Sequence, residues 1–168
     1  IEGLFLSSGV FKDANTTMER LVRVAKKLRL EERFNGYIHL KTISGASDEL
    51  IREAGLYADR LSINLEIPTK EGLKLLAPEK DHKQMLSNVE FVKNELAIST
   101  IEKQKYKHAP KFAPAGQTTQ MIIGATNETD QKIIHVADYM YQKLSLKRVY
   151  CSGYVPVLQD SRLPSLQS

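Results

Sequence analysis

Strand-like and helix-like segments alternate along this chain, and this alternation constrains the fold more than any other feature of the sequence. Short apolar or alternating runs predict strands, and longer stretches with apolar residues three and four positions apart predict helices. The expected strands are 3–9, 36–43, 60–66, 118–124 and 147–154, and the expected helices are 17–30, 48–58, 70–76, 81–103 and one that begins at Thr129 and Asp130. Because strand–helix–strand crossovers are right-handed and join parallel strands, the pattern predicts an α/β fold with a parallel sheet.

The segment 61–66 has the clearest strand pattern. Positions 61, 63 and 65 are Leu or Ile, whereas Ser62, Asn64 and Glu66 are polar. Side chains alternate across a strand, so one face is apolar and the other is polar. An antiparallel strand at a solvated surface gives the same pattern, but the helices on both sides favour a parallel strand. In a parallel barrel the polar face points inward and ligands bind near the carboxyl ends, which places Glu66 at the rim.

Composition describes an ordinary globular domain. The 168 residues are 42% hydrophobic and 26% charged, with a formal net charge of +4. No apolar run approaches the roughly 20 residues that span a bilayer, so no membrane partner is expected. The single cysteine, Cys151, excludes an internal disulfide framework and favours a cytoplasmic location. The chain begins Ile1-Glu2-Gly3 without a methionine, from which we expect a piece of a longer protein.

Several helix starts are recognisable from their capping residues. Thr16 followed by Glu19 matches a capping box for the first helix. Ser47 and Thr69 are expected N-caps of the next two helices, and Asp81 opens the longest one.

Polar and small residues gather where the expected strands end. In parallel α/β folds these ends meet at one edge of the sheet, where ligands bind. A carboxylate accepts from ribose hydroxyls or an ammonium group, and a lysine binds a carboxylate, so the set suits a zwitterionic ligand that carries a ribose. The expected strand-end residues are Ser7, Ser8, Gly9, Lys41, Thr42, Asn64, Glu66, Gly124, Ala125, Thr126, Cys151, Ser152 and Gly153.

Four of these stretches, in this order, resemble the rim segments of a radical S-adenosylmethionine barrel. They are most similar to the branch of that superfamily that is associated with DNA modification or repair. The resemblance covers nearly the whole chain, and each short segment is weak without the others. The segments are Leu6-Ser7-Ser8-Gly9-Val10, Ser62-Ile63-Asn64-Leu65-Glu66, Gln120-Met121-Ile122-Ile123-Gly124-Ala125-Thr126 and Tyr150-Cys151-Ser152-Gly153-Tyr154.

The resemblance implies an incomplete TIM-type (βα) barrel over residues 1–155, followed by a tail at 156–168. It implies that Ser7, Ser8 and Gly9 meet the amino group of S-adenosylmethionine. Asn64 and Glu66 would then approach the ribose or carboxylate. The adenine would lie against the remaining segments, at Ile122, Gly124 and the stretch from Tyr150 through Ser152 to Gly153.

Two departures from the family pattern bear on this expectation. The Cys-x-x-x-Cys-x-x-Cys loop that holds the family's [4Fe–4S] cluster is absent, and one cysteine cannot replace three thiolates. Gln120 stands where the family often has glycine. The chain is therefore expected to be the cofactor-binding wall of a parent radical enzyme and to be inactive alone, with the cluster held elsewhere in the parent and no metal ligands here.

Two other functions remain open at this point. One is a non-catalytic α/β ligand-binding or scaffold domain. The other is an aldolase-type barrel in which Lys41 forms a Schiff base, although a rim lysine that pairs with Glu66 is the simpler interpretation. On the same inner face, His39 is expected to be a hydrogen-bonded core histidine. Cys151 is expected to be a small buried residue.

Two interactions with partners are also expected. The basic stretch 103–117 predicts an irregular loop whose Lys103, Lys105, Lys107 and Lys111 could contact phosphates while Tyr106 stacks on a base, although a flexible, solvated charge run is the simpler interpretation. An incomplete barrel also has exposed sheet edges, which predict either self-association or disorder near the missing part.

Overall fold

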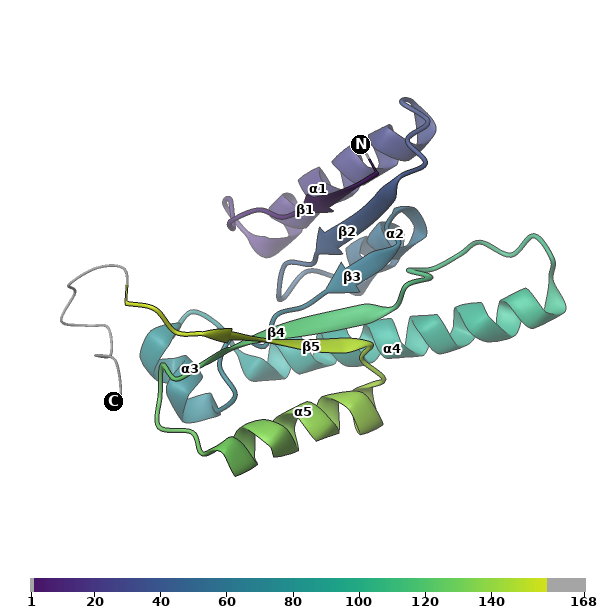
Figure 1. The fold of residues 1–168 in the computed structure, drawn as a ribbon. Helices are drawn as coiled ribbons and strands as arrows, with labels where there is room; N and C mark the ends of the chain where they lie inside the picture. The colour runs from purple at the N-terminus through teal and green to yellow at the C-terminus, as the bar shows by residue number, and fades with distance from the viewer. Residues whose placement is uncertain (1, 157–168) are drawn as a thin grey trace.

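The computed structural model describes residues 2–156 and shows one five-stranded sheet with helices packed along it (Figure 1). The strands lie in the order β1-β2-β3-β4-β5 and every neighbouring pair is parallel. This confirms the predicted α/β fold with sequential parallel strands, which form half of a barrel. The elements are β1 (Gly3–Leu6), α1 (Ala14–Leu30), β2 (Tyr37–Lys41), α2 (Asp48–Tyr57), β3 (Arg60–Ser62), α3 (Lys70–Leu76), α4 (His82–Lys105), β4 (Gln117–Ile123), α5 (Asp130–Leu144) and β5 (Arg148–Gly153).

Side-chain caps begin the helices, mostly where the sequence predicts them. Ser47, Thr69 and Thr129 each accept a hydrogen bond from a backbone N–H in the first turn of the helix that follows, and Asp81 does the same for α4. The first helix differs from the prediction. Its cap is Asp13, which accepts from the backbone N–H of Thr16, so α1 begins at Ala14 and no capping box at Thr16 and Glu19 starts it.

The strand predicted over 60–66 ends early, because the chain bulges there. β3 pairs Ser62 with Thr118, and pairing resumes only at Glu66 with Met121. From Ser62 to Glu66 the chain advances four residues, whereas the paired segment of β4 advances three, from Thr118 to Met121. One extra residue therefore lies on the β3 side. The backbone N–H of Leu65 donates to the Thr119 hydroxyl at 2.9 Å instead of to a carbonyl. Glu66 adopts a left-handed φ of 65°, which changes the direction of its side chain relative to a regular strand.

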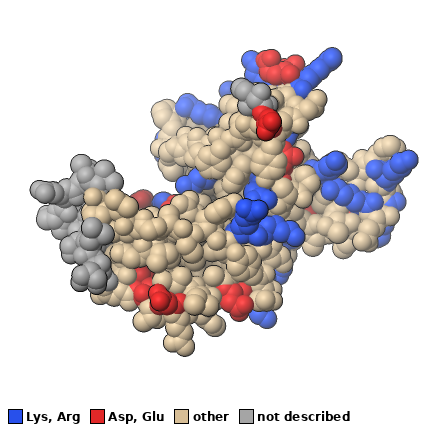
Figure 2. Space-filling model, viewed as in Figure 1, with Lys and Arg blue, Asp and Glu red and all other residues tan. Residues whose placement is uncertain are grey.

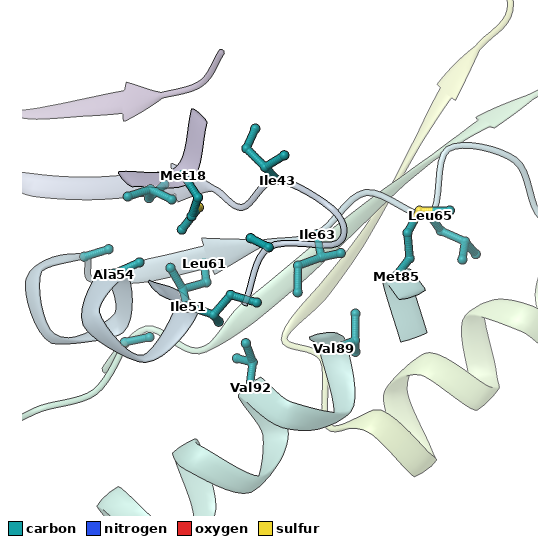
Figure 3. Close-up of a cluster of buried hydrophobic side chains, with 14 of the residues drawn as sticks. Met18, Ile43, Ile51, Ala54, Leu61, Ile63, Leu65, Met85, Val89 and Val92 are labelled. Carbon is teal, nitrogen blue, oxygen red and sulfur yellow. The ribbon is translucent and has the colours of Figure 1, made fainter. Parts of the chain in front are cut away.

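The hydrophobic core lies on one face of the sheet only. Ile38, Leu40, Leu61 and Met121 point toward the helices and are fully buried. Helix α1 packs on α2, α2 on α4, and α4 on α5, so the helices form a single row around the sheet. Figure 3 shows the middle of this core, where side chains from the sheet meet those of α2 and α4. The opposite face of the sheet carries no layer of helices in the part of the chain that the structure describes.

The loop after α4 is anchored at one end. Helix α4 continues to Lys105, two residues beyond its predicted end, so Lys103 and Lys105 lie on the helix and not in the predicted loop. These two lysines, Lys107, Lys111 and Tyr106 are exposed. Phe112 is buried against Gly55, and the backbone N–H of Ala113 donates to the Gly55 carbonyl at 2.7 Å. The predicted contact with nucleic acid remains a prediction.

Strands β1 and β5 end the sheet, so the self-association expected through exposed edges also remains a prediction. The helices described between residues 2 and 156 include none long and apolar enough to cross a membrane. Most of the expected tail at 156–168 lies outside the described residues.

Candidate functional site

A cleft of about 580 Å³ opens at the carboxyl ends of β1, β2 and β3. Turns after β1 and β2, the bulge after β3 and the start of α4 surround it. Parallel pairing in sequential order is what brings these strand ends together. The cleft collects five of the predicted site residues, which are Ser8, Gly9, Lys41, Asn64 and Glu66.

Glu66 lies between two lysines at the edge of the cleft. Its Oε1 is 2.9 Å from the Nζ of Lys80 and 3.7 Å from the Nζ of Lys41. The Lys41 pair was predicted from the sequence. Lys80 was not predicted, because it precedes α4 in an irregular segment and no local pattern points it toward β3. The carboxylate is 17% exposed, so this group of three charges is shielded from solvent on most sides.

A line of polar side chains crosses the inner face from β3 to β5. The Asn64 amide donates to the Gln120 Oε1 at 3.5 Å, and the Gln120 Nε2 donates to the Ser152 hydroxyl at 3.1 Å. Gln120 is the residue that departs from the family's glycine. Here its side chain joins two predicted site residues, Asn64 and Ser152, that lie on different strands.

A smaller hollow of about 290 Å³ adjoins the cleft on the inner face. Lys41 and Asn64 line both spaces, and Ser7, His39 and Tyr150 line the hollow alone. Burial, and then the charge of Arg60, lower the pKa of His39 below its ordinary value. Its Nε2 is buried without a hydrogen-bond partner among the described residues, so the predicted hydrogen-bonded histidine is wrong.

The remaining predicted residues lie at the same end of the sheet but outside both spaces. Ile122 pairs with Ser152, and Gly153 pairs with the residue after Ile122. Gly124 follows β4 with a φ of 84°, and a Cβ atom there would meet nothing within 4 Å. Together, Ile122, Gly124, Ser152 and Gly153 form a surface beside the hollow, which we call the open shelf. Cys151 is exposed, which corrects the expectation of a buried cysteine.

The described residues do not fit a metal centre. No group of three or more His, Cys, Asp or Glu side chains within residues 2–156 is placed to hold a metal ion. One exposed thiol offers a single ligand, whereas a [4Fe–4S] cluster takes three or four.

Comparisons with known proteins add little to this description. A crystal structure of ligand-free type DHODH from Eimeria tenella matches with a TM-score of 0.42 and 19% sequence identity. The match covers 88% of this chain and 42% of that chain, so this chain spans less than half the length of the protein it matches. No family model and no curated protein matches the chain. The structure itself shows a partial TIM-barrel-like α/β domain with a polar cleft at its strand ends.

Proposed function

We propose that this chain is the S-adenosylmethionine-binding wall of a radical S-adenosylmethionine enzyme. The observation that carries the proposal is the convergence of Ser8, Gly9, Lys41, Asn64 and Glu66 on one cleft. These residues come from three different strand ends, and three of them, Ser8, Asn64 and Glu66, are polar groups that the resemblance assigns to the cofactor. The second support is the order of the four resembling segments along parallel strands.

The cleft suits the size and polarity of the cofactor. Its volume of about 580 Å³ falls inside the range of roughly 300–1,000 Å³ for small-molecule sites. Ser8 and Gly9 would face the amino group, and Lys41 would meet the carboxylate of the methionine part. Asn64 and Glu66 would bind the ribose hydroxyls as donor and acceptor.

The adenine would extend along the inner face toward β5. Tyr150 lines the hollow beside the cleft, and its ring offers a stacking surface. Ser152, Ile122, Gly124 and Gly153 would border the base on the open shelf. In the resembling family the bound sulfonium supplies a carbon–sulfur bond that is cleaved reductively.

The [4Fe–4S] cluster is a separate part of the proposal. The residues of this chain do not fit it, so the proposal leaves the cluster to cysteines that this chain does not contain. Modification or repair of a nucleic acid is the activity that the resemblance suggests for such an enzyme.

No observation favours the aldolase or the scaffold function. Borohydride trapping of a carbonyl compound at Lys41 would be the result that favours the aldolase.

We expect the 168-residue chain to bind S-adenosylmethionine in isothermal titration calorimetry. Asn64→Ala and Lys41→Gln should each weaken binding roughly tenfold, because each removes one hydrogen bond to a polar or charged group of the ligand. Asn94→Ala and Lys74→Gln are matched controls, since both side chains are exposed on helices away from the cleft. They should change the affinity by less than about twofold.

Two results would contradict the proposal. One is an absence of binding at millimolar ligand while the chain is folded by circular dichroism. The other is equal weakening by the site variants and their controls. The enzyme part has its own test, which is the iron content and S-adenosylmethionine cleavage of the whole protein after anaerobic reconstitution. Failure to assemble a cluster there would remove the radical chemistry and leave the binding result standing.

A further inference from the structure

The inner face of the sheet carries a second group of side chains, none of which lines the cofactor cleft. Strand alternation places these side chains on the face of the sheet opposite to the face that carries Ile38 and Leu61, which are fully buried in the core. The register confirms that they are neighbours, since His39 pairs with Arg60 across β2 and β3, and Arg148 pairs with Thr118 across β4 and β5. We call this group the inner basic patch; it consists of Phe5, Tyr37, His39, Arg60, Thr118, Arg148 and Tyr150.

The patch contains buried polar atoms that lack partners. The Nε of Arg60, the Nε2 of His39 and the Oγ1 of Thr118 make no hydrogen bond to any residue that the structure describes. A buried donor without a partner costs roughly 1–3 kcal/mol, so such groups usually have one. Two of these atoms belong to His39 and Arg60, which are paired across β2 and β3, so the patch has donors that its own residues do not satisfy.

The charge of the patch is also unbalanced. Neither Arg60 nor Arg148 forms an ion pair within residues 2–156. The nearest acidic side chains along the strands are already engaged. Asp59 binds Arg29 at 2.7 Å, and Glu66 binds Lys80 and Lys41. Basic side chains gather near the centre of the view in Figure 2.

Aromatic rings lie among these cations. Phe5 is 58% exposed, Tyr37 is 40% exposed and Tyr150 is 44% exposed, so their faces are open to a ligand. The Phe5 ring meets His39 edge to face, with 4.8 Å between centroids. Phe5, His39, Thr118 and Tyr150 line the 290 Å³ hollow. Exposed aromatic faces beside arginines are the combination that binds nucleobases and their phosphates.

We propose that the inner basic patch binds a phosphate-bearing nucleobase, either as a free nucleotide or within a single strand. Arg60 and Arg148 contact the phosphate from strands on either side of β4, roughly 10 Å apart if each strand spacing is about 4.8 Å. Tyr37, which is 40% exposed, stacks on the base. Tyr37, Arg60 and Arg148 play no part in the proposed cofactor site, whereas Tyr150 and the hollow are shared with its adenine end.

The probe is a fluorescein-labelled oligothymidylate of about ten nucleotides, within the length range of single-strand sites. Fluorescence anisotropy with the 168-residue chain at low salt measures its affinity. We expect Arg60→Gln and Arg148→Gln each to weaken binding roughly tenfold and to reduce the salt slope by about one. Tyr37→Leu keeps an apolar side chain but removes the ring, and it should also weaken binding roughly tenfold.

Arg23→Gln is the matched control, because Arg23 is exposed on α1 and the substitution removes the same charge. It should change the affinity by less than about twofold. Circular dichroism confirms that each variant is folded, and calorimetry should show unchanged binding of S-adenosylmethionine in Arg60→Gln. Competition by thymidine monophosphate would identify a free nucleotide as the ligand, and its failure to compete would identify a single strand.

Three results would overturn the proposal. The first is equal binding by Arg60→Gln and Arg23→Gln. The second is loss of binding when Lys103, Lys105, Lys107 and Lys111 become alanine while Arg60→Gln binds normally, which would place the contact on the loop after α4. The third is equally tight binding of an oligoglutamate peptide, which would show an unselective charged surface.

Discussion

Leu61→Ala is expected to lower the free energy of unfolding by about 4 kcal/mol, as large-to-small changes in a packed core do. Leu61 is fully buried on the middle strand of the sheet, between the side chains of α2 and the start of β4. Removal of three carbon atoms there leaves a cavity that the surrounding strands cannot close. Urea denaturation followed by circular dichroism measures the change.

Leu75→Ala is the control for this substitution. Leu75 belongs to α3 and is 68% exposed, so the same chemical change should alter stability by about 0.5 kcal/mol or less. Similar losses from the two variants would mean that the helix-facing side of the sheet is not the core of the protein.

Arg29→Met should lower the free energy of unfolding by about 3 kcal/mol, because it leaves several acceptors without a donor at once. The guanidinium donates to the carbonyls of Phe34, Gly36 and Tyr57 at 2.6–3.0 Å. It also donates to Asp59 at 2.7 Å, and the same Asp59 oxygen accepts from the backbone N–H of Ile38. One side chain therefore ties the end of α1 to the start of β2 and to the segment before β3.

Arg23→Met on the exposed side of α1 is the matched control, and it should change stability by about 0.5 kcal/mol or less. A double-mutant cycle with Asp59→Asn measures the direct coupling between the two side chains. An Arg29→Met variant as stable as Arg23→Met would show that the arginine contributes only a solvated charge.

Local features of the fold were predictable from the sequence, because they depend on neighbouring residues. The caps at Ser47, Thr69 and Thr129 each need only the residue and the turn that follows it. The cap of α1 was misplaced, because Asp13 and Thr16 are both good capping residues. The structure shows that the Asp13 carboxylate binds both the N–H and the hydroxyl of Thr16.

Apart from the Lys41–Glu66 pair, features that depend on contacts between strands were not predictable. At the bulge before Glu66, the backbone N–H of Leu65 donates to the hydroxyl of Thr119, a residue far away in sequence. The lysine that pairs best with Glu66 comes from an irregular segment after α3. The unpaired atoms of His39 and Arg60 likewise follow from the register of β2 with β3. Strand order brought five of the predicted rim residues to one cleft, and these distant contacts set where their side chains point.

The central claim is that the carboxyl ends of β1, β2 and β3 form one binding cleft for S-adenosylmethionine. Hydrogen–deuterium exchange of the 168-residue chain, with and without the ligand at saturation, tests it most directly. We predict slower exchange at 7–10, 41–44, 63–66 and 79–85, with no change along α5. Slower exchange confined to other segments, or no change at a ligand concentration where calorimetry records binding, would contradict the claim.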